Sequence, residues 1–139
     1  MPEARTLVAG TAMGRALVLD EPLSFWGGID PATGDIVDSR HPQHGQNVAG
    51  RILVMPSGRG SSSSSSVLAE AIRAGTAPAA IVLGEADPIL ALGAIVAREL
   101  FGTTIPVIVT TEAAFRTDDL ATVRADENGV ELRGAESEA

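Results

Sequence analysis

A run of glycine and serine residues is the segment of this sequence best suited to chemistry. Gly58, Arg59 and Gly60 are followed by six consecutive serines at 61–66 and then by an apolar segment. Free backbone N–H groups and the positive end of a helix dipole at such a loop bind carboxylate or phosphate groups. Glycine allows close approach and positive φ, arginine offers two parallel donors, and serine adds hydroxyl groups and a helix N-cap. We predict an anion-binding loop whose ligand contacts Gly58, Arg59, Gly60 and Ser62.

The composition of this loop also fits a flexible linker, since Gly/Ser-rich segments often have that role. Here, however, a buried-type strand at 51–55 directly precedes the loop, and an amphipathic helix from residue 67 follows the serines. A flexible linker is not expected between the strand and the helix of one crossover. The flanking elements therefore favour the anion site, and composition leaves open which of the six serines reacts.

An aromatic pair before the loop is a second candidate. Phe25 and Trp26 precede Gly27, Gly28 and Asp30 in a stretch that is too polar for a core. These side chains would form a pocket wall or a lid, and a contact that pins the loop or anchors another subunit fits them equally well. We count Trp26 and Asp30 among the candidate substrate-binding residues.

Two histidines form a weak candidate metal set. His41 and His44 lie three residues apart near Asp38, in a Pro/Gly-rich loop without helical spacing and without the third ligand of known zinc sites. The pattern favours a solvated histidine first and a loop-ordering or substrate-polarising His41 second. We keep His41 as a candidate substrate-binding residue. Three further acidic residues follow expected strands and are interpreted as helix caps rather than active-site carboxylates: Glu85, Asp87 and Glu112.

The overall composition excludes several classes of protein. The 139 residues carry a formal net charge of −8, which opposes the phosphate neutralisation required for nucleic-acid binding. Without lysine, the chain has neither a Schiff-base lysine nor the lysine of a Walker A loop. Without cysteine, it cannot hold an iron–sulfur cluster or a disulfide by its own thiolates. The sequence shows neither a signal peptide nor a membrane span, so we expect a cytoplasmic protein.

Alternating strands and helices are expected to position the loop. The expected strands are 6–19, as one strand or a bent pair, 34–38, 51–55, 79–83 and 106–110, with a hairpin at 121–132. Helices are expected from residue 67 to Gly75 and at 88–100. Parallel crossovers flanked by β-rich segments predict an α/β domain in which a sheet packs helices on one side and strands on the other, a β/β/α sandwich. We assign residues 1–134 to this single domain and 135–139 to a disordered polar tail.

These motifs together resemble a known family. The segments EPLSFWGGID at 21–30, HP at 41–42 and PSGRGSSSS at 56–64 are similar, in this order, to the small subunit of aconitase X. The resemblance covers nearly the whole chain. It implies the swivelling β/β/α fold of the mobile domain of aconitases and dehydration of a small hydroxy acid. It also implies a heteromeric enzyme, with a large partner subunit whose cysteines hold an iron or iron–sulfur centre.

The resemblance also implies a role for one serine. The serine directly after the glycine loop maps to Ser61, which would act as general base near the substrate carboxylate while the partner's metal, as Lewis acid, withdraws the hydroxyl group. Because serine is a weak base, the helix N-terminus, neighbouring donors or Arg59 must stabilise its alkoxide. The serine-rich loop is more similar to bacterial dehydratases of cis-3-hydroxy-L-proline, which give pyrroline-2-carboxylate. Archaeal phosphomevalonate dehydratases are the alternative.

Two functions of other classes stay open. A non-catalytic anion-binding or regulatory module would use the same loop without needing the serine hydroxyl. In addition, residues 94–100, with Pro106 and Val107 after them, are similar to the phosphohistidine swivelling domain of phosphoenolpyruvate-utilising enzymes. In that family a histidine just before this run carries the phosphoryl group, whereas Leu92 and Gly93 stand here. Phosphoryl transfer by that route is therefore disfavoured.

Overall fold

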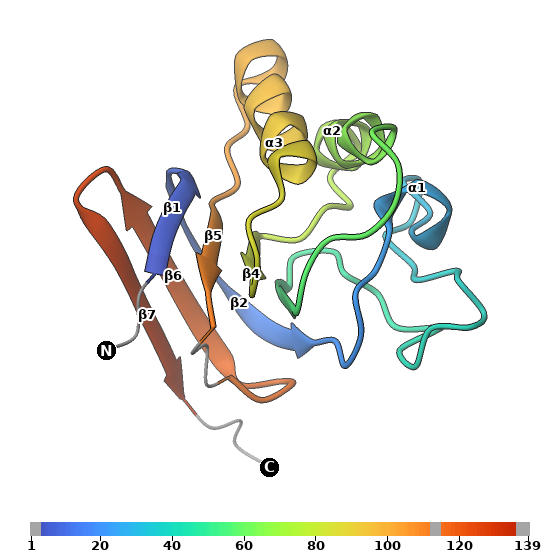
Figure 1. Ribbon diagram of the computed structural model, residues 1–139, viewed down its shortest axis with the longest axis horizontal. Helices are drawn as coiled ribbons and strands as arrows, with labels where there is room; N and C mark the ends of the chain where they lie inside the picture. Colours follow the sequence, from blue (N-terminus) through green and yellow to red (C-terminus); the bar gives the residue numbers. More distant parts are fainter. Residues whose placement is uncertain (1–3, 112–114, 136–139) are drawn as a thin grey trace.

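The computed structural model describes residues 4–111 and 115–135, which form seven strands and two main helices. Figure 1 shows how these elements are arranged. The elements in chain order are β1 (Ala4–Val8), β2 (Gly10–Val18), α1 (Phe25–Gly28), β3 (Ile52–Met55), α2 (Ser64–Ala74), β4 (Ala80–Leu83), α3 (Pro88–Phe101), β5 (Val107–Thr110), β6 (Leu120–Asp126) and β7 (Gly129–Ala135). The strands are hydrogen-bonded in the order β1-β5-β4-β3-β2-β6-β7. No helix in the described ranges is long and apolar enough to cross a membrane.

The three central strands carry the crossovers predicted from the sequence. β3 pairs with β4, and β4 pairs with β5, both in parallel. Each strand is a short apolar run with both faces covered, as is typical of parallel sheets. Helices α2 and α3 connect these strands and pack against each other. The predicted alternation of strands and helices is confirmed.

Strand β2 belongs to two parts of the sheet. Its C-terminal half pairs in parallel with β3, with Ala16 opposite Ile52, while its N-terminal half pairs antiparallel with β6, with Gly10 opposite Ala125. β1 lies at the far edge, antiparallel to β5. The segment 6–19, expected to form one strand or a bent pair, therefore belongs to two strands, β1 and β2, which pair with different partners.

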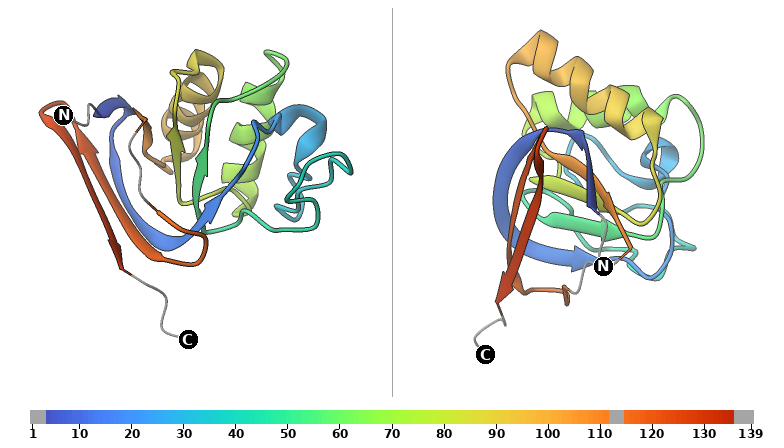
Figure 2. Two further views of the ribbon diagram at one scale, coloured as in Figure 1. Left: turned by 60° about the horizontal axis from the view of Figure 1, so that its bottom comes forward. Right: turned by 60° about the vertical axis from the view of Figure 1, so that its left-hand side comes forward.

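Side chains of the central strands alternate between two cores, as the two-residue period of a strand requires. Leu53 and Ile81 belong to the larger core with the helices, whereas Ile52 and Val82 belong to a second core with Val123 of β6. The hairpin β6–β7 and the helices thus cover opposite faces of the central strands (Figure 2). The predicted β/β/α layering is confirmed.

Two expectations for segments outside the central strands differ from the structure. The strand expected at 34–38 is wrong: only isolated bridges form there, Ile29 with Ile36 and Asp35 with Asn47. These short contacts hold a loop that packs on the domain through Ile36, which is buried. Strand β7 extends to Ala135, the first residue of the expected tail, and 136–139 lie outside the described residues.

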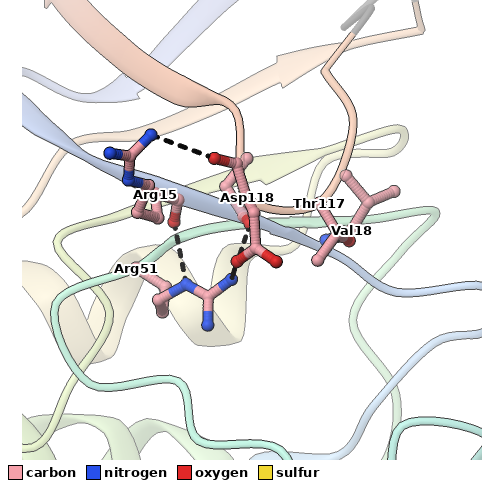
Figure 3. Close-up of polar contacts among 6 residues, drawn as sticks. Arg15, Val18, Arg51, Thr117 and Asp118 are labelled. Atoms are coloured by element: carbon pink, nitrogen blue, oxygen red, sulfur yellow. Dashed lines mark hydrogen bonds and ion pairs between the residues drawn. The ribbon is translucent and has the colours of Figure 1, made fainter. Parts of the chain in front are cut away.

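Arg51, directly before β3, connects β2 to the segment before β6 through hydrogen bonds (Figure 3). Its Nε donates to the Arg15 carbonyl at 3.0 Å, and its Nη2 donates to the Ala16 carbonyl and to Oδ1 of Asp118, both at 2.8 Å. Asp118 has a φ of 74°, and its N–H donates to the same Ala16 carbonyl. One side chain therefore serves three acceptors from two segments.

Replacing Arg51 by methionine is expected to lower the free energy of unfolding by about 2–3 kcal/mol, because charged donors to three acceptors are lost at a position that is only 21% exposed. Urea denaturation measures the loss. The matched control is Arg73→Met, which removes an ion pair with Glu70 between exposed side chains and is expected to change stability little. Equal losses in the two variants would contradict the role of Arg51.

Candidate functional site

A cavity of about 470 Å³ lies where three distant segments meet. Its lining residues come from the segments 21–28, 38–41 and 59–60, which carry the FWGG, HP and GRG motifs. The cavity wall carries charges of both signs, from Glu21, Asp38, Arg40 and Arg59. The structure therefore brings the motifs predicted from the sequence to one place.

The aromatic pair divides its roles. Phe25 is buried in the larger core together with Leu23, and Leu23 forms a parallel bridge with Gly58 of the glycine loop. Trp26 is 59% exposed and lines the cavity. Phe25 is thus the residue that anchors the segment, and Trp26 is a residue of the cavity wall.

The two glycines of the loop are needed for different reasons. A Cβ on Gly58 would overlap the carboxylate of Asp87, which caps helix α3 by accepting the N–H groups of Ile89 and Leu90 at 2.9 and 3.2 Å. Gly60 has a φ of 99°, and a Cβ there would meet the Ser24 hydroxyl group. Positive φ, expected at both positions, is found only at Gly60, because close packing rather than backbone conformation requires Gly58. The predicted capping role of Asp87 is confirmed.

The serine run forms a turn that leads directly into α2. The N–H of Ser63 donates to Oγ of Ser61, and the N–H of Ser64 donates to the Ser61 carbonyl, both at 3.0 Å. Ser63 itself makes no side-chain cap, and the helix begins at Ser64 rather than at residue 67. Within the described ranges, the backbone N–H groups of Gly60, Ser61 and Ser62 have no acceptor. These donors at a helix N-terminus are available to an anion.

The residues next to these donors differ in their access to the cavity. Arg59 and Gly60 line it, and the Arg59 guanidinium has no hydrogen bond or ion pair with the described residues. Ser61 is half-buried and directly follows the lining residues, while the Ser62 side chain is exposed. Neither serine is part of the cavity wall itself. Arg59 is therefore the side chain of the loop best placed to bind a carboxylate from the cavity.

His41 orders the loop that surrounds the cavity. The residue is only 7% exposed. Nδ1 accepts the N–H of Gln43 at 3.0 Å, so Nε2 carries the proton and donates to the Glu21 carbonyl at 3.1 Å. The expectation of a solvated histidine is wrong for His41, because both ring nitrogens are engaged in a buried position. The histidine fixes the main chain that carries Glu21.

Asp30 and Glu85 lie apart from the cavity wall. The Asp30 carboxylate accepts the N–H of Ala32 at 2.9 Å and forms a turn, and Asp30 does not line the cavity. Glu85 is exposed, and Glu112 lies outside the described residues. Among the residues that the structure describes, no group of three His, Cys, Asp or Glu side chains could hold a metal ion.

Glu21 and Arg40 line the cavity, although neither is among the site residues predicted from the sequence. Glu21 begins the EPLSFWGGID segment, and Arg40 directly precedes His41. The Glu21 carboxylate has no partner in the described part of the chain, and Arg40 lies 3.9 Å from Oδ1 of Asp38. Away from the cavity, on the exposed face of α2, hydrogen bonds from Arg73 lower the pKa of Glu70.

A family model and several known proteins match this chain. Residues 2–132 match the family model described as the aconitase X swivel domain. The chain is 54% identical over 117 residues to a cis-3-hydroxy-L-proline dehydratase from Pseudomonas aeruginosa, and the match covers 84% of this chain and 20% of that protein. It is 40% identical over 129 residues to a phosphomevalonate dehydratase small subunit from Thermococcus gammatolerans, covering 92% and 94%. The chain thus spans a small part of the first relative and nearly all of the second.

Solved structures give the same fold. The crystal structure of Thermococcus kodakaraensis aconitase X in its holo-form matches with a TM-score of 0.83 and 38% identity, over 95% of this chain and 97% of that chain. A UPF0107 protein solved by NMR in solution matches with a TM-score of 0.79 and 39% identity, over 94% and 97%. The swivelling β/β/α architecture predicted from the sequence is confirmed.

Proposed function

Because this chain belongs to the aconitase X swivel-domain family, we propose that it supplies the small, swivelling part of a hydro-lyase and completes an active site with a larger aconitase X partner. The observation that carries this proposal is a set of donors without a partner in the described part of the chain: the N–H groups of Gly60, Ser61 and Ser62 and the nearby guanidinium of Arg59. Such donors bind a carboxylate, and Arg59 and Gly60 belong to the cavity wall. The relatives named as dehydratases support the reaction class.

The proposed substrate is cis-3-hydroxy-L-proline, with pyrroline-2-carboxylate as product. The 54% identity to a dehydratase named for this substrate supports it. The cavity charges support it as well, because Glu21 and Asp38 stand with Arg40 and Arg59, and a wall with both signs suits a zwitterion. Phosphomevalonate carries anionic groups alone and would meet two carboxylates. It is the second candidate because of the 40% identity to a small subunit named for it.

Ser61 is the proposed general base. The N–H of Ser63, 3.0 Å from Oγ of Ser61, would stabilise its alkoxide, and the helix N-terminus adds a favourable field. Arg59 and the free N–H groups would hold the substrate carboxylate, which makes the proton on the adjacent carbon easier to remove. Ser61 would accept that proton as the neighbouring carbon loses its hydroxyl group. Trp26 would form the wall beside the substrate ring.

The donor chemistry of this chain does not fit an iron–sulfur cluster. The chain has no cysteine, and the described residues offer no group of three ligands for a metal. We therefore assign the iron centre to the partner, and to this chain only substrate binding and proton transfer.

Reconstitution tests the proposal. The chain alone is expected to form no pyrroline-2-carboxylate from cis-3-hydroxy-L-proline, and the same chain mixed with its large aconitase X partner is expected to form it. Turnover of phosphomevalonate but not of hydroxyproline would select the second substrate. If the mixture is inactive on both substrates and calorimetry shows that the chain alone binds carboxylates, the chain is a non-catalytic anion-binding module and not part of a dehydratase.

A further inference from the structure

One serine of the run points into the protein instead of toward solvent. Ser64, the first residue of α2, is only 3% exposed, whereas the neighbouring Ser62, Ser63 and Ser66 are exposed. The Ser64 Oγ accepts the backbone N–H of Trp26 at 3.1 Å, a contact between residues 38 positions apart in the chain. The serine run is thereby connected directly to the aromatic wall of the cavity.

The main chain of Trp26 is held from its other side as well. Its carbonyl accepts the hydroxyl group of Ser24 at 2.8 Å, and the missing side chain of Gly60 leaves the room that Ser24 occupies. Trp26 has non-helical φ and ψ of −72° and 114° within the short element α1, and Gly27 has a φ of 78°. The two serine hydroxyls thus hold a turn from which the indole lines the cavity.

We infer that Ser64 is a positioning residue, whose hydroxyl group fixes the main chain of Trp26 so that the indole forms the wall against which the cationic ring of the substrate packs. The identity of this ring rests on the proposed function. An indole face attracts an ammonium group and packs well against an aliphatic ring. Since Ser64 also begins the helix behind the anion-binding loop, it fixes the spacing between the donors for the carboxylate and the wall for the ring.

Trp26 is the single tryptophan of a chain without tyrosine, so its fluorescence reports this positioning without any ligand. In Ser64→Ala, we expect lower fluorescence anisotropy and stronger acrylamide quenching of Trp26 than in wild type. Ser66→Ala, which changes an exposed serine of the same helix, is the matched control and is expected to leave both values unchanged. Ser64→Thr, which keeps the hydroxyl group, is expected to restore them.

In the reconstituted enzyme, Ser64→Ala is expected to raise KM for cis-3-hydroxy-L-proline by roughly three- to tenfold and to leave kcat nearly unchanged. The reason is that one neutral hydrogen bond is lost and that this bond affects substrate binding only. If circular dichroism shows that Ser64→Ala is unfolded, Ser24→Ala tests the same positioning of Trp26, because it removes the hydroxyl group that donates to the Trp26 carbonyl. The same changes in fluorescence and KM are expected.

Fluorescence equal to that of Ser66→Ala would overturn the inference, as would altered fluorescence with an unchanged KM. A wild-type complex that does not dehydrate hydroxyproline would instead contradict the proposed function. The fluorescence comparison on the chain alone would still decide whether Ser64 positions Trp26.

Discussion

Replacing Ser61 by alanine is expected to lower kcat of the reconstituted dehydratase by about 100- to 10,000-fold, the range that a positioned general base contributes. KM should change little, because the N–H groups of the loop and the Arg59 guanidinium remain. The Ser63 N–H that donates to the Ser61 Oγ would lose an acceptor on the exposed side of the loop, where water replaces it. Initial rates at saturating substrate measure the effect.

The control for this experiment is Ser66→Ala, which removes an exposed hydroxyl group from the first turns of α2, away from the cavity wall. Its kcat is expected to match wild type. Near-normal turnover of Ser61→Ala would show that another group takes the proton. Exchange of the substrate proton with deuterated water provides an independent measure, since it should disappear together with turnover if Ser61 is the base.

Replacing Gly58 by alanine is expected to have the second-largest effect, although it adds a single methyl group. The added Cβ would overlap the Asp87 carboxylate, so either the loop or the cap of α3 must move. We expect the free energy of unfolding to fall by about 1–3 kcal/mol from overpacking and loss of the cap. We also expect kcat/KM to fall by about 100-fold, because displaced donors no longer meet the substrate carboxylate.

A double-mutant cycle with Asp87 tests whether the clash between the added methyl group and the carboxylate causes these losses. Asp87→Ala alone is expected to cost about 1 kcal/mol, because the N–H groups of Ile89 and Leu90 lose their acceptor. With the carboxylate gone, Gly58→Ala should cost less than it does in wild type. Denaturation and kinetic measurements on the four proteins give the coupling. Strictly additive losses would contradict the proposed clash.

The elements around the site were predictable where the signal was local. Short runs of consecutive residues predicted these elements. Apolar runs predicted β3, β4 and β5, and the pair Asp87-Pro88 predicted the start of α3. The loop between β3 and α2 could be placed for the same reason. Helix α2 begins earlier than expected because turn hydrogen bonds from Ser64, Ser65 and Ser66 override the weak helix propensity of serine.

The composition of the cavity was harder to predict because distant contacts create it. Glu21 reaches the wall through the His41 hydrogen bond and through the bridge between Leu23 and Gly58, which join segments 20 and more residues apart. The hydrophobic periodicity of the sequence does not predict contacts between distant segments. The burial of His41 also depends on a distant contact, its hydrogen bond to the Glu21 carbonyl, so the local sequence does not predict it. Asp30 lies within the EPLSFWGGID segment, but its carboxylate accepts the N–H of Ala32 and forms a turn instead of lining the cavity.

The pairing of β2 with two different strands has a consequence for motion. One half of this strand completes the layer under the helices and the other half completes the layer with β6, so the two layers share a continuous backbone. Sliding of one layer over the other would break hydrogen bonds in both at once. Under the proposed function, in which the domain turns against a larger partner, this rigidity means that a force applied at the glycine–serine loop rotates the whole domain instead of shearing its layers.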